Sequence, residues 1–354
     1  MSAAHARVRL AIDAANFVRD RRGMGRIARA VLAAASAALD FDVTLLADRR
    51  DDTAALRREF PAGVVRPAGT ARRRRQYDVV WYPFNGMRFT AAAPSLVTIH
   101  DALAFTEPHS ERIARLREQR PIRRAAREGT RILTDSAWSR AEIVRELGVA
   151  PERIDVVHPS PDSFWFPARD ERLPLPLAGT RYALVVGVRE ARKNARLALE
   201  ACAAALHGAG ESLVIVGELE AATRAYAGTL GLRAGEIAAT DVVLRALYRN
   251  ARVVLVPSLA EGFGLVAIEA MACGAAVIAS NASALPEATD GAALLLDPRD
   301  TAGWARAIRS LFDDDAAVRA LRARGAARFA AADRDASQRR TLALLRELAR
   351  SAGA

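Results

Sequence analysis

The residues best suited to chemistry lie in one segment, 257–280, which reads PSLAEGFGLVAIEAMACGAAVIAS. A glycine-rich turn at 262–264 follows an apolar run and precedes a helical pattern. Glycines let backbone N–H groups approach a ligand closely, and the N-terminus of a helix favours a phosphate. Glu261 and Glu269 flank the turn, and each carboxylate can accept hydroxyl hydrogen bonds of the kind that a sugar or a ribose offers. The segment predicts a phosphate cradle with a carboxylate on each side.

Two charged residues stand out from their surroundings. Glu269 lies among apolar residues in the stretch VAIEAMA, where an ionised carboxylate needs a polar partner. An ordinary strand–turn–helix would explain the glycines but not this glutamate. Lys193 is the only lysine among the 52 basic residues of the chain. A lysine presents a compact point charge and an arginine a planar fork of donors, so the two are not interchangeable at an anion site.

The elements that must position these residues alternate along nearly the whole chain. Short apolar, β-branched runs are separated by longer helical patterns, which predicts an α/β fold of parallel sheets with helical crossovers. In the first half we expect strands near 8–13, 43–47, 78–82, 96–100, 131–134 and 154–157, and helices near 25–39, 111–128 and 139–147. Ser136 or Ser139 can cap the last of these helices, and Gly148 can end it. In the second half the expected strands lie near 182–187, 213–217, 252–257, 275–279 and 293–296, with a short connection from Glu218 to a helix at 240–250 and arginine-rich helices from 301 to 350.

The chain is predicted to divide into two doubly wound, Rossmann-like domains. Residues 159–176 hold five of the fifteen prolines and show no periodic pattern, which is typical of a semi-rigid linker. We therefore expect an N-terminal domain at 1–168, a C-terminal domain at 177–330, and a helix at 331–354 that packs back towards the first domain. Two such domains would leave a cleft between the carboxyl ends of their strands, where open α/β sheets bind ligands.

Composition excludes several classes of protein. The 354 residues are 51% hydrophobic and 26% charged, which is typical of a globular protein and excludes a disordered or disulfide-dense chain. Cys202 and Cys273 fit no metal-binding or redox spacing, and we expect them to be buried and reduced. No apolar run reaches the roughly 18 residues that a membrane-spanning helix needs. We therefore expect a cytoplasmic protein, and any contact with a membrane would be peripheral.

The positive charge is concentrated in the first half. The net charge is +11, and residues 1–168 carry 28 basic and 20 acidic side chains, whereas 169–354 carry 24 and 21. Arg72–Arg75 form the densest run, and the helix at 111–128 adds seven arginines. A solvated surface of mixed charge would account for much of this. The excess also predicts attraction to an anionic membrane face or a phosphorylated acceptor.

The segment 257–280 resembles the E-G-F-G-L-x-x-x-E-A-M-A-C-G signature of the retaining glycosyltransferases of family GT4, which have the GT-B fold, and its two glutamates have the family's spacing. Other segments also resemble the family, and they follow one another in the same order as in the family over roughly residues 8–300. They are RRGMGRIARAV at 21–31, VTIHDALAFTEP at 97–108, the last unit of the first domain at 132–162, VVGVREARKNARLALEA at 185–201 and LYRNARVVLVPS at 247–258. The conjunction is specific, although most single segments are weak signals.

This resemblance implies that the first domain, 1–168, is the acceptor side and that the second, 177–330, binds the nucleotide sugar. It also implies roles for particular residues. Lys193 and Arg192 would neutralise the diphosphate of a nucleotide-sugar donor, Glu269 would hold the ribose hydroxyls, and Glu261 would contact hydroxyls of the donor sugar. His100 would lie near the sugar. The backbone lining sugar and phosphate would come from Gly262, Phe263, Gly264 and Leu265 in the second domain, and from Gly23 and Gly25 in the first.

One departure from the family pattern affects the diphosphate loop. The family often has an arginine directly after the strand-end glycine, but this chain has Val188 there, with Arg189 next. The arginine that assists Lys193 is therefore open between Arg189 and Arg192.

The resemblance implies a retaining, metal-independent hexosyltransferase without a cofactor. Its donor would be a nucleoside-diphosphate sugar, with GDP-mannose mildly preferred. Its acceptor would be lipid-linked or an oligosaccharide, in the synthesis of a bacterial cell-surface polysaccharide such as lipopolysaccharide. The arginines of the first domain would contact an anionic membrane peripherally, and no nucleic acid would be bound.

Three alternatives remain at this point. Gly23, Gly25 and Ala28, with Asp48 twenty residues on, match a dinucleotide-binding pattern, although nine residues separate the end of the first strand from Gly23. A non-catalytic binder of anionic polymers would use the net positive charge, but the chain lacks a recognition motif and is only 6% aromatic. An inactive GT-B-like scaffold is the third. The Asp313–Asp315 run has a metal-binding spacing, but its place before a helix favours a cap over a metal site.

Overall fold

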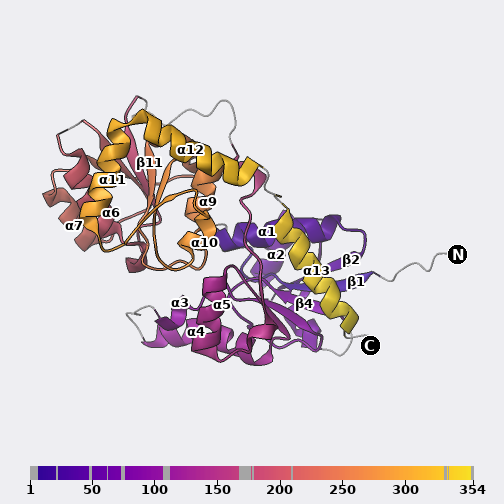
Figure 1. The fold of residues 1–354 in the computed structure, drawn as a ribbon. Coiled ribbons are helices and arrows are strands. Elements are labelled where there is room, and N and C mark those ends of the chain that lie inside the picture. The colour runs from indigo at the N-terminus through magenta and orange to yellow at the C-terminus, as the bar shows by residue number, and fades with distance from the viewer. Residues whose placement is uncertain are drawn as a thin grey trace. The chain divides into compact units, whose positions relative to one another are not determined.

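The protein is described by a computed structural model that covers residues 7–20, 23–47, 50–61, 63–72, 76–106, 112–166, 177, 179–208, 210–330, 333 and 335–351. The chain forms two compact units, one from Met1–Ser160 with Asp335–Ala354 and the other from Pro161–Arg334. Each unit is a parallel sheet with helices on both faces (Figure 1). The expected α/β class with two Rossmann-like sheets is confirmed.

The first unit is built on a seven-stranded parallel sheet of order β3-β2-β1-β4-β5-β6-β7. Its strands are β1 (Val8–Asp13), β2 (Phe41–Ala47), β3 (Val64–Pro67), β4 (Val79–Tyr82), β5 (Ser95–Thr98), β6 (Arg131–Thr134) and β7 (Ile154–Val156). Its helices are α1 (Gly23–Ala37), α2 (Arg50–Glu59), α3 (Leu103–Thr106), α4 (Arg112–Glu128), α5 (Ala137–Leu147) and α13 (Ala336–Ser351). The two sheet faces bury alternate strand residues, one against α1 and α13 and the other against α4 and α5.

The residues predicted to cap the two ends of α5 are confirmed. Ser136 is its N-cap and accepts a hydrogen bond from the backbone N–H of Ser139 at 2.9 Å. Gly148 ends the helix in the left-handed region, at φ 64°. Strand β3, by contrast, was not predicted. It is an edge strand whose residues are largely exposed and which ends in Pro67, so it lacks the apolar pattern of a buried strand.

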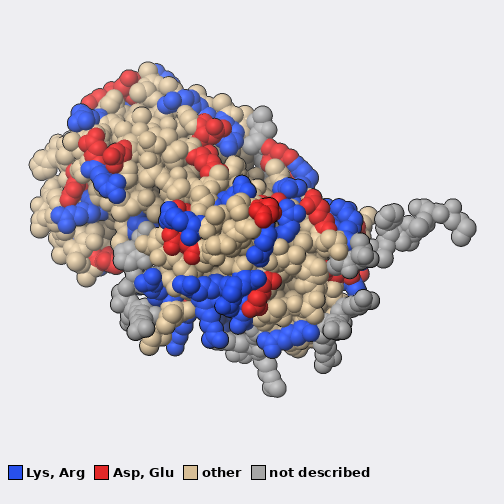
Figure 2. Space-filling model, turned by 60° about the horizontal axis from the view of Figure 1, so that its bottom comes forward, with Lys and Arg blue, Asp and Glu red and all other residues tan. Residues whose placement is uncertain are grey.

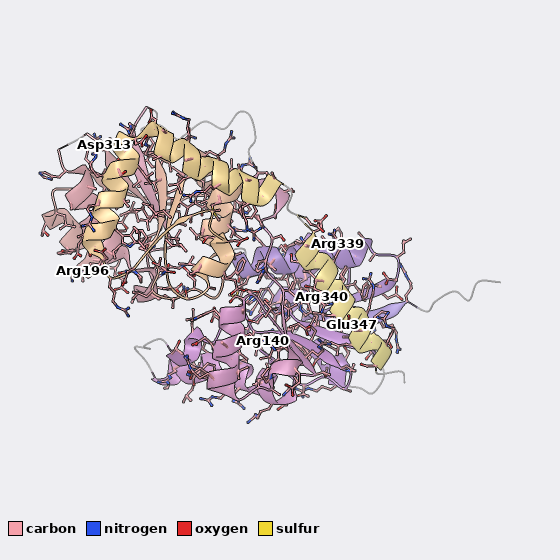
Figure 3. The ribbon with its side chains drawn as sticks, viewed as in Figure 1. Arg140, Arg196, Asp313, Arg339, Arg340 and Glu347 are labelled. Carbon is pink, nitrogen blue, oxygen red and sulfur yellow. The ribbon has the colours of Figure 1, made fainter. Side chains whose placement is uncertain are left out.

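Helix α13 completes the first unit from the far end of the sequence. It packs against α1, β4 and β5, and its buried leucines belong to the same core as β1. Ion pairs reinforce this packing, because Arg346 contacts Asp40 at 2.6 Å and Arg340 contacts Asp155 at 3.4 Å. Within α13 itself, Arg340 also pairs with Glu347 at 3.6 Å (Figure 3).

The second unit is built on a six-stranded parallel sheet of order β10-β9-β8-β11-β12-β13. Its strands are β8 (Tyr182–Val186), β9 (Ser212–Val216), β10 (Ala234–Ile237), β11 (Val253–Val256), β12 (Val277–Ser280) and β13 (Leu294–Leu296). Its helices are α6 (Ala195–Leu206), α7 (Ala221–Thr229), α8 (Asp241–Asn250), α9 (Leu265–Ala272), α10 (Leu285–Thr289), α11 (Thr301–Asp313) and α12 (Asp315–Ala330). Where the sequence predicted a short connection before α8, the chain instead forms α7 and the exposed edge strand β10.

The boundary between the units differs from the one that the proline pattern predicted. The first unit ends at Ser160, eight residues before its expected end at 168, and the second begins at Pro161. Trp165 explains the difference, since it is only 1% exposed and lies in the core of the second unit, 5.8 Å from the ring of Tyr248. The buried thiol of Cys273 donates to the Trp165 carbonyl at 2.9 Å. The rest of the expected linker, 167–176, lies outside the described residues.

Candidate functional site

Two loops of the second unit meet at the point where the strand order of its sheet reverses. Strands β8 and β11 are hydrogen-bonded neighbours, although α6 to α8 separate them in sequence. The loop after β8 carries Arg192 and Lys193, and the loop after β11 carries Glu261. Open α/β sheets bind ligands at such switch points, beyond the carboxyl ends of the strands. The topology therefore brings the predicted cations and the first predicted carboxylate to one place.

The Glu261 carboxylate is the centre of this cluster. Lys193 Nζ donates to Oε1 at 2.6 Å, and Arg192 Nη1 donates to Oε2 at 3.0 Å. Ser258 Oγ adds a third hydrogen bond, to Oε1 at 2.7 Å. Glu261 is 7% exposed, so a paired and hydrogen-bonded carboxylate is what such burial requires. Glu190 also pairs with Arg192.

The cluster holds Glu261 in its ionised form. Burial alone would raise the pKa of this carboxyl group, and burial is the largest single influence on it. The charges of Lys193 and Arg192, with the hydrogen bonds from Lys193 and Ser258, together outweigh burial and hold the Glu261 pKa below its usual value. Glu261 is thus an acceptor of hydrogen bonds at neutral pH.

Unusual backbone conformations fix the two loops. Gly264 is the N-cap of α9 at φ 110°, and a Cβ atom there would lie 2.6 Å from Leu285 Cδ2. Asn194 caps α6 at φ 55°, and its side-chain amide donates to the carbonyls of Pro257 at 3.1 Å and Pro298 at 2.9 Å. Asn194 therefore ties the cation loop to the end of β11, and the glycine turn packs directly on α10.

The other residues predicted in the second unit lie in α9 and in the turn that precedes it. Gly262, Phe263 and Gly264 are buried in the turn, Leu265 opens the helix, and Glu269 is 5% exposed in its second turn. Of the two arginines that the sequence left open, Arg192 reaches Glu261, whereas Arg189 is exposed; Val188 beside it is buried in the core.

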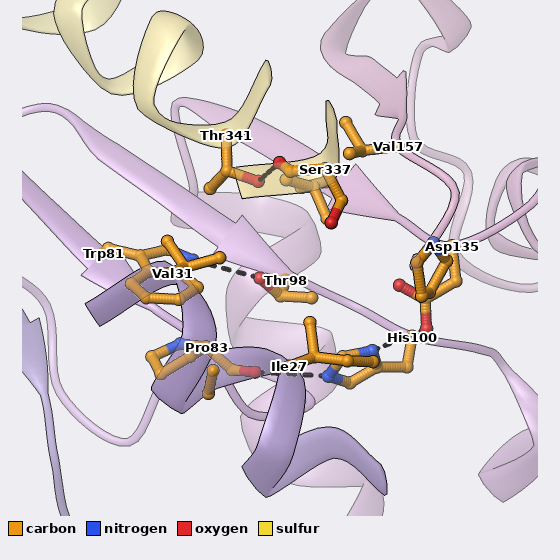
Figure 4. Close-up of a pocket in the computed structure, with 13 residues that line it drawn as sticks. Ile27, Val31, Trp81, Pro83, Thr98, His100, Asp135, Val157, Ser337 and Thr341 are labelled. Carbon is orange, nitrogen blue, oxygen red and sulfur yellow. Dashed lines mark hydrogen bonds and ion pairs between the residues drawn. The ribbon is translucent and has the colours of Figure 1, made fainter. Parts of the chain in front are cut away.

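His100 lies in the first unit, just beyond β5, and is 4% exposed. Its Nδ1 is 2.7 Å from Asp135 Oδ2, and its Nε2 is 3.2 Å from the Pro83 carbonyl oxygen (Figure 4). Its backbone N–H donates to Asn85 Oδ1 at 2.7 Å. A cavity of about 20 Å³, roughly the space of one water molecule, lies between this pair and Ser337 of α13.

Both ring nitrogens of His100 thus face acceptors, an arrangement that suits the doubly protonated ring. Burial, the largest single influence, would lower the His100 pKa, but the charge and the hydrogen bond of Asp135 outweigh it and raise the pKa above its ordinary value. The sequence predicted a ligand contact for His100. The contacts that the structure gives its ring are within the first unit.

Gly25 is required by the packing of the first unit itself. A Cβ atom at this position of α1 would lie 1.9 Å from the Asp20 carbonyl oxygen. Arg29 strengthens the same contact, because its Nη1 donates to that oxygen at 2.8 Å. Gly23 is the first residue of α1, ten positions beyond the end of β1, whereas the turn of a dinucleotide fold is tight. Asp48, which the dinucleotide alternative needs, lies outside the described residues.

Three residues of the site were not anticipated. Asn194 links the two loops, and Ser258 and Ser283 contact Glu261. The i to i+3 spacing of Ser258 and Glu261 in a loop could have suggested the first contact. Ser283 lies after β12, and its contact depends on how neighbouring strands are ordered, which no local pattern reveals.

The described residues contain neither a metal-binding cluster nor a membrane-spanning helix. Among them, no group of three or more histidine, cysteine or acidic side chains could hold a metal ion. Of the Asp313–Asp315 run, Asp314 accepts hydrogen bonds from the backbone N–H groups of Ala316 and Ala317, as expected of a helix cap. No helix in the described part of the chain combines the length and the apolar character needed to cross a membrane.

Comparison with known proteins matches both units. The family model for "Glycosyl transferases group 1" matches residues 180–314, and that for "Glycosyltransferase Family 4" matches 22–162. A D-inositol 3-phosphate glycosyltransferase of Catenulispora acidiphila is 30% identical over 316 residues, 77% of this chain and 71% of the relative. An O-antigen chain mannosyltransferase B of Escherichia coli is 33% identical over 241 residues, 62% of each chain. The fold is similar to that of HepE from Anabaena, solved with UDP and glucose, with a TM-score of 0.73, 16% identity, and 96% of this chain and 100% of the other covered.

Proposed function

The chain belongs to the group 1 glycosyltransferases of family 4, and we propose that it transfers a sugar from a nucleoside-diphosphate sugar with retention of the anomeric configuration. One observation carries the proposal: Lys193 and Arg192 converge on Glu261 at the switch point of the second sheet, beside the glycine turn that opens α9. The cluster offers two fixed cations and a helix N-terminus to a diphosphate, and carboxylates to sugar and ribose hydroxyls.

The cations supply the electrostatic part of catalysis. When the bond between the sugar and the diphosphate breaks, negative charge grows on the leaving phosphate. Lys193 and Arg192 are preorganised by Glu261 and Ser258, so they stabilise this charge more than that of the bound donor. We propose that this makes the transfer independent of a metal ion. We expect the same activity with and without excess EDTA. A loss of activity in EDTA that Mg²⁺ or Mn²⁺ restores would contradict the proposal.

The donor is proposed to be GDP-mannose, with UDP-sugars as the main competitor. Two relatives named mannosyltransferases support mannose, whereas the similarly folded HepE was solved with UDP. The deciding experiment incubates the full chain with a panel of sugar nucleotides and follows donor hydrolysis by mass spectrometry, which needs no acceptor. We expect release of the nucleoside diphosphate from GDP-mannose first. If no donor is hydrolysed, the result would favour the alternative of an inactive GT-B-like scaffold.

The same assay tests the site. Lys193→Ala and Glu269→Ala should lose hydrolysis while keeping the fold, as followed by circular dichroism and thermal unfolding. Arg319→Glu, an exposed substitution on α12, serves as a control that should keep full activity. Full activity in either site variant would overturn the assignment.

The acceptor is proposed to be a lipid-linked or oligosaccharide intermediate of a cell-surface polysaccharide such as lipopolysaccharide. The O-antigen mannosyltransferase among the relatives supports this class. Basic side chains gather over the first unit on the face shown in Figure 2. Helix α4 contributes exposed arginines at 115, 117 and 120 beside two exposed apolar side chains, Ile113 at 64% and Leu116 at 57%. Such a mixture fits the surface of an anionic membrane.

We propose that α4 holds the protein at the cytoplasmic face of the membrane. Each arginine near an anionic surface contributes about 1 kcal/mol, and this contribution falls with salt. The full chain should sediment with vesicles that contain phosphatidylglycerol and not with pure phosphatidylcholine, and release should follow rising salt. Arg117→Glu with Arg120→Glu should weaken binding, whereas Arg319→Glu should not. Equal binding to both vesicle types, or to neither, would remove the proposal.

A further inference from the structure

Two serines hold Glu261 from different sides. Ser258, two residues after β11, is 1% exposed, and its hydroxyl lies 2.7 Å from Glu261 Oε1. An ionised carboxylate only accepts hydrogen bonds, so the single hydroxyl proton of Ser258 is directed at Glu261. The carboxylate is thereby fixed in one orientation by a neutral group as well as by the cations.

Ser283 holds the backbone of the same residue. Its Oγ accepts from the backbone N–H of Glu261 at 2.9 Å and donates to the Ala282 carbonyl at 2.7 Å. The Ser283 hydroxyl therefore acts both as an acceptor and as a donor. Ser283 has φ 52°, a left-handed conformation that L residues other than asparagine and aspartate rarely adopt. Strain of this kind persists where the surrounding structure holds it, often at functional sites.

The hydrogen bonds leave the two carboxylate oxygens unequal. Among the described residues, Oε1 accepts from both Lys193 and Ser258, whereas Oε2 accepts only from Arg192. A carboxylate oxygen has about two acceptor positions, so Oε1 is filled and Oε2 has one position left. A hydroxyl of a bound ligand would thus meet Oε2.

We propose that Ser258 and Ser283 are positioning residues of the site, which aim Glu261 Oε2 at a hydroxyl of the donor sugar. Ser258 sets which oxygen is presented, and Ser283 sets where the loop places it. The inference rests on the proposed function, since the hydroxyl belongs to the sugar of the donor.

The first test separates Ser258 from a merely structural residue. Ser258→Ala removes a hydrogen bond that favours the ionised carboxylate, so the pKa of Glu261 should rise by roughly one unit. The acid limb of the pH profile of donor hydrolysis should move to higher pH by the same amount. Ser258→Thr keeps a hydroxyl and should restore the wild-type profile. Ser310→Ala, on the exposed side of α11, is the matched control and should change nothing.

The second test uses the strained backbone of Ser283. Ser283→Ala loses the hydroxyl and keeps the strain, whereas Ser283→Gly loses both. We expect each variant to lower kcat for hydrolysis about tenfold with little change in KM or in the pH profile, although the glycine variant should be the more thermostable of the two. Wild-type kcat in Ser283→Gly would show that the hydroxyl does not position the loop.

Two measurements that need no catalytic turnover test the positioning roles separately from the proposed function. The pKa of Glu261 can be followed in the full chain by ¹³C NMR of labelled glutamate side chains, with Glu261→Gln assigning the resonance. Hydrogen exchange of the Glu261 amide should be faster in both Ser283 variants. Failure of the wild type to hydrolyse any donor would sink the proposed function alone. An unshifted Glu261 pKa in Ser258→Ala, or unchanged amide exchange, would overturn the positioning roles.

Discussion

Removal of the Lys193 ammonium should affect both stability and activity, and by separable amounts. In the structure this group lies 2.6 Å from Glu261 Oε1, in a pair whose side chains are 15% and 9% exposed. Lys193→Ala leaves a buried carboxylate with fewer partners. Breaking a buried pair from one side can cost 3–5 kcal/mol, but Arg192 and Ser258 still hold Glu261 here, so we expect the smaller loss of a charged hydrogen bond, about 2 kcal/mol.

The expected loss of stability converts into a measurable shift. For a unit of this size, about 2 kcal/mol corresponds to a fall in Tm of roughly 4–8 °C. Activity should fall further, because Lys193 would also face the leaving diphosphate. Loss of one preorganised group that stabilises transition-state charge typically lowers kcat by about 10²–10³-fold.

A double-mutant cycle with Glu261→Gln tests the reasoning. The neutral amide does not need a cation, so Lys193→Ala should destabilise the Glu261→Gln background much less than the wild type. The coupling energy, from urea unfolding of the four proteins, should be at least about 1 kcal/mol. A coupling below about 0.3 kcal/mol, within the scatter of independent sites, would refute the pairing and with it the preorganised cluster.

Three other predictions follow from single contacts. Gly264→Ala should lower Tm by several degrees and reduce donor hydrolysis, because its backbone is left-handed and the new methyl group would meet Leu285; unchanged Tm and activity would contradict the described turn. The raised His100 pKa adds stability that is fully present below the unfolded pKa of about 6.5 and is lost as pH rises through the higher folded value. Urea unfolding should therefore show a decline above pH 6.5 that His100→Asn lacks, and parallel profiles would argue against the pair with Asp135. Ser136→Ala should cost about 1 kcal/mol through loss of the α5 cap, measured as a shift in the urea midpoint, and an unchanged midpoint would count against the cap.

The parts of the fold that the sequence predicts are those with a strong local pattern. Strands such as β8 and β11 are buried on both faces and appear as continuous apolar runs. The edge strands β3 and β10 expose most of their residues, so their sequences resemble loops, and both were missed. The boundary at Pro161 was missed because Trp165 anchors a proline-rich segment that looks like a linker by composition.

The same distinction applies to the candidate site: features that are local in sequence could be predicted, and contacts made by packing could not. The glycine turn with Glu261 and Glu269 could be found because all its parts are local in sequence. The contact between Lys193 and Glu261 could not, since it joins residues 68 positions apart through the pairing of β8 with β11. The burial of Val188, which left Arg192 as the arginine at Glu261, likewise depends on packing.

The return of α13 to the first unit has a consequence for the order in which the protein is made. Most of the first unit leaves the ribosome first, but α13, whose leucines pack against α1, β4 and β5, follows the whole of 161–334. At usual rates of translation this interval lasts roughly 10–35 s. During that time the apolar surface that later binds the leucines of α13 has no cover from its own helix. All residues of the second unit are therefore synthesised before the first unit receives its last helix.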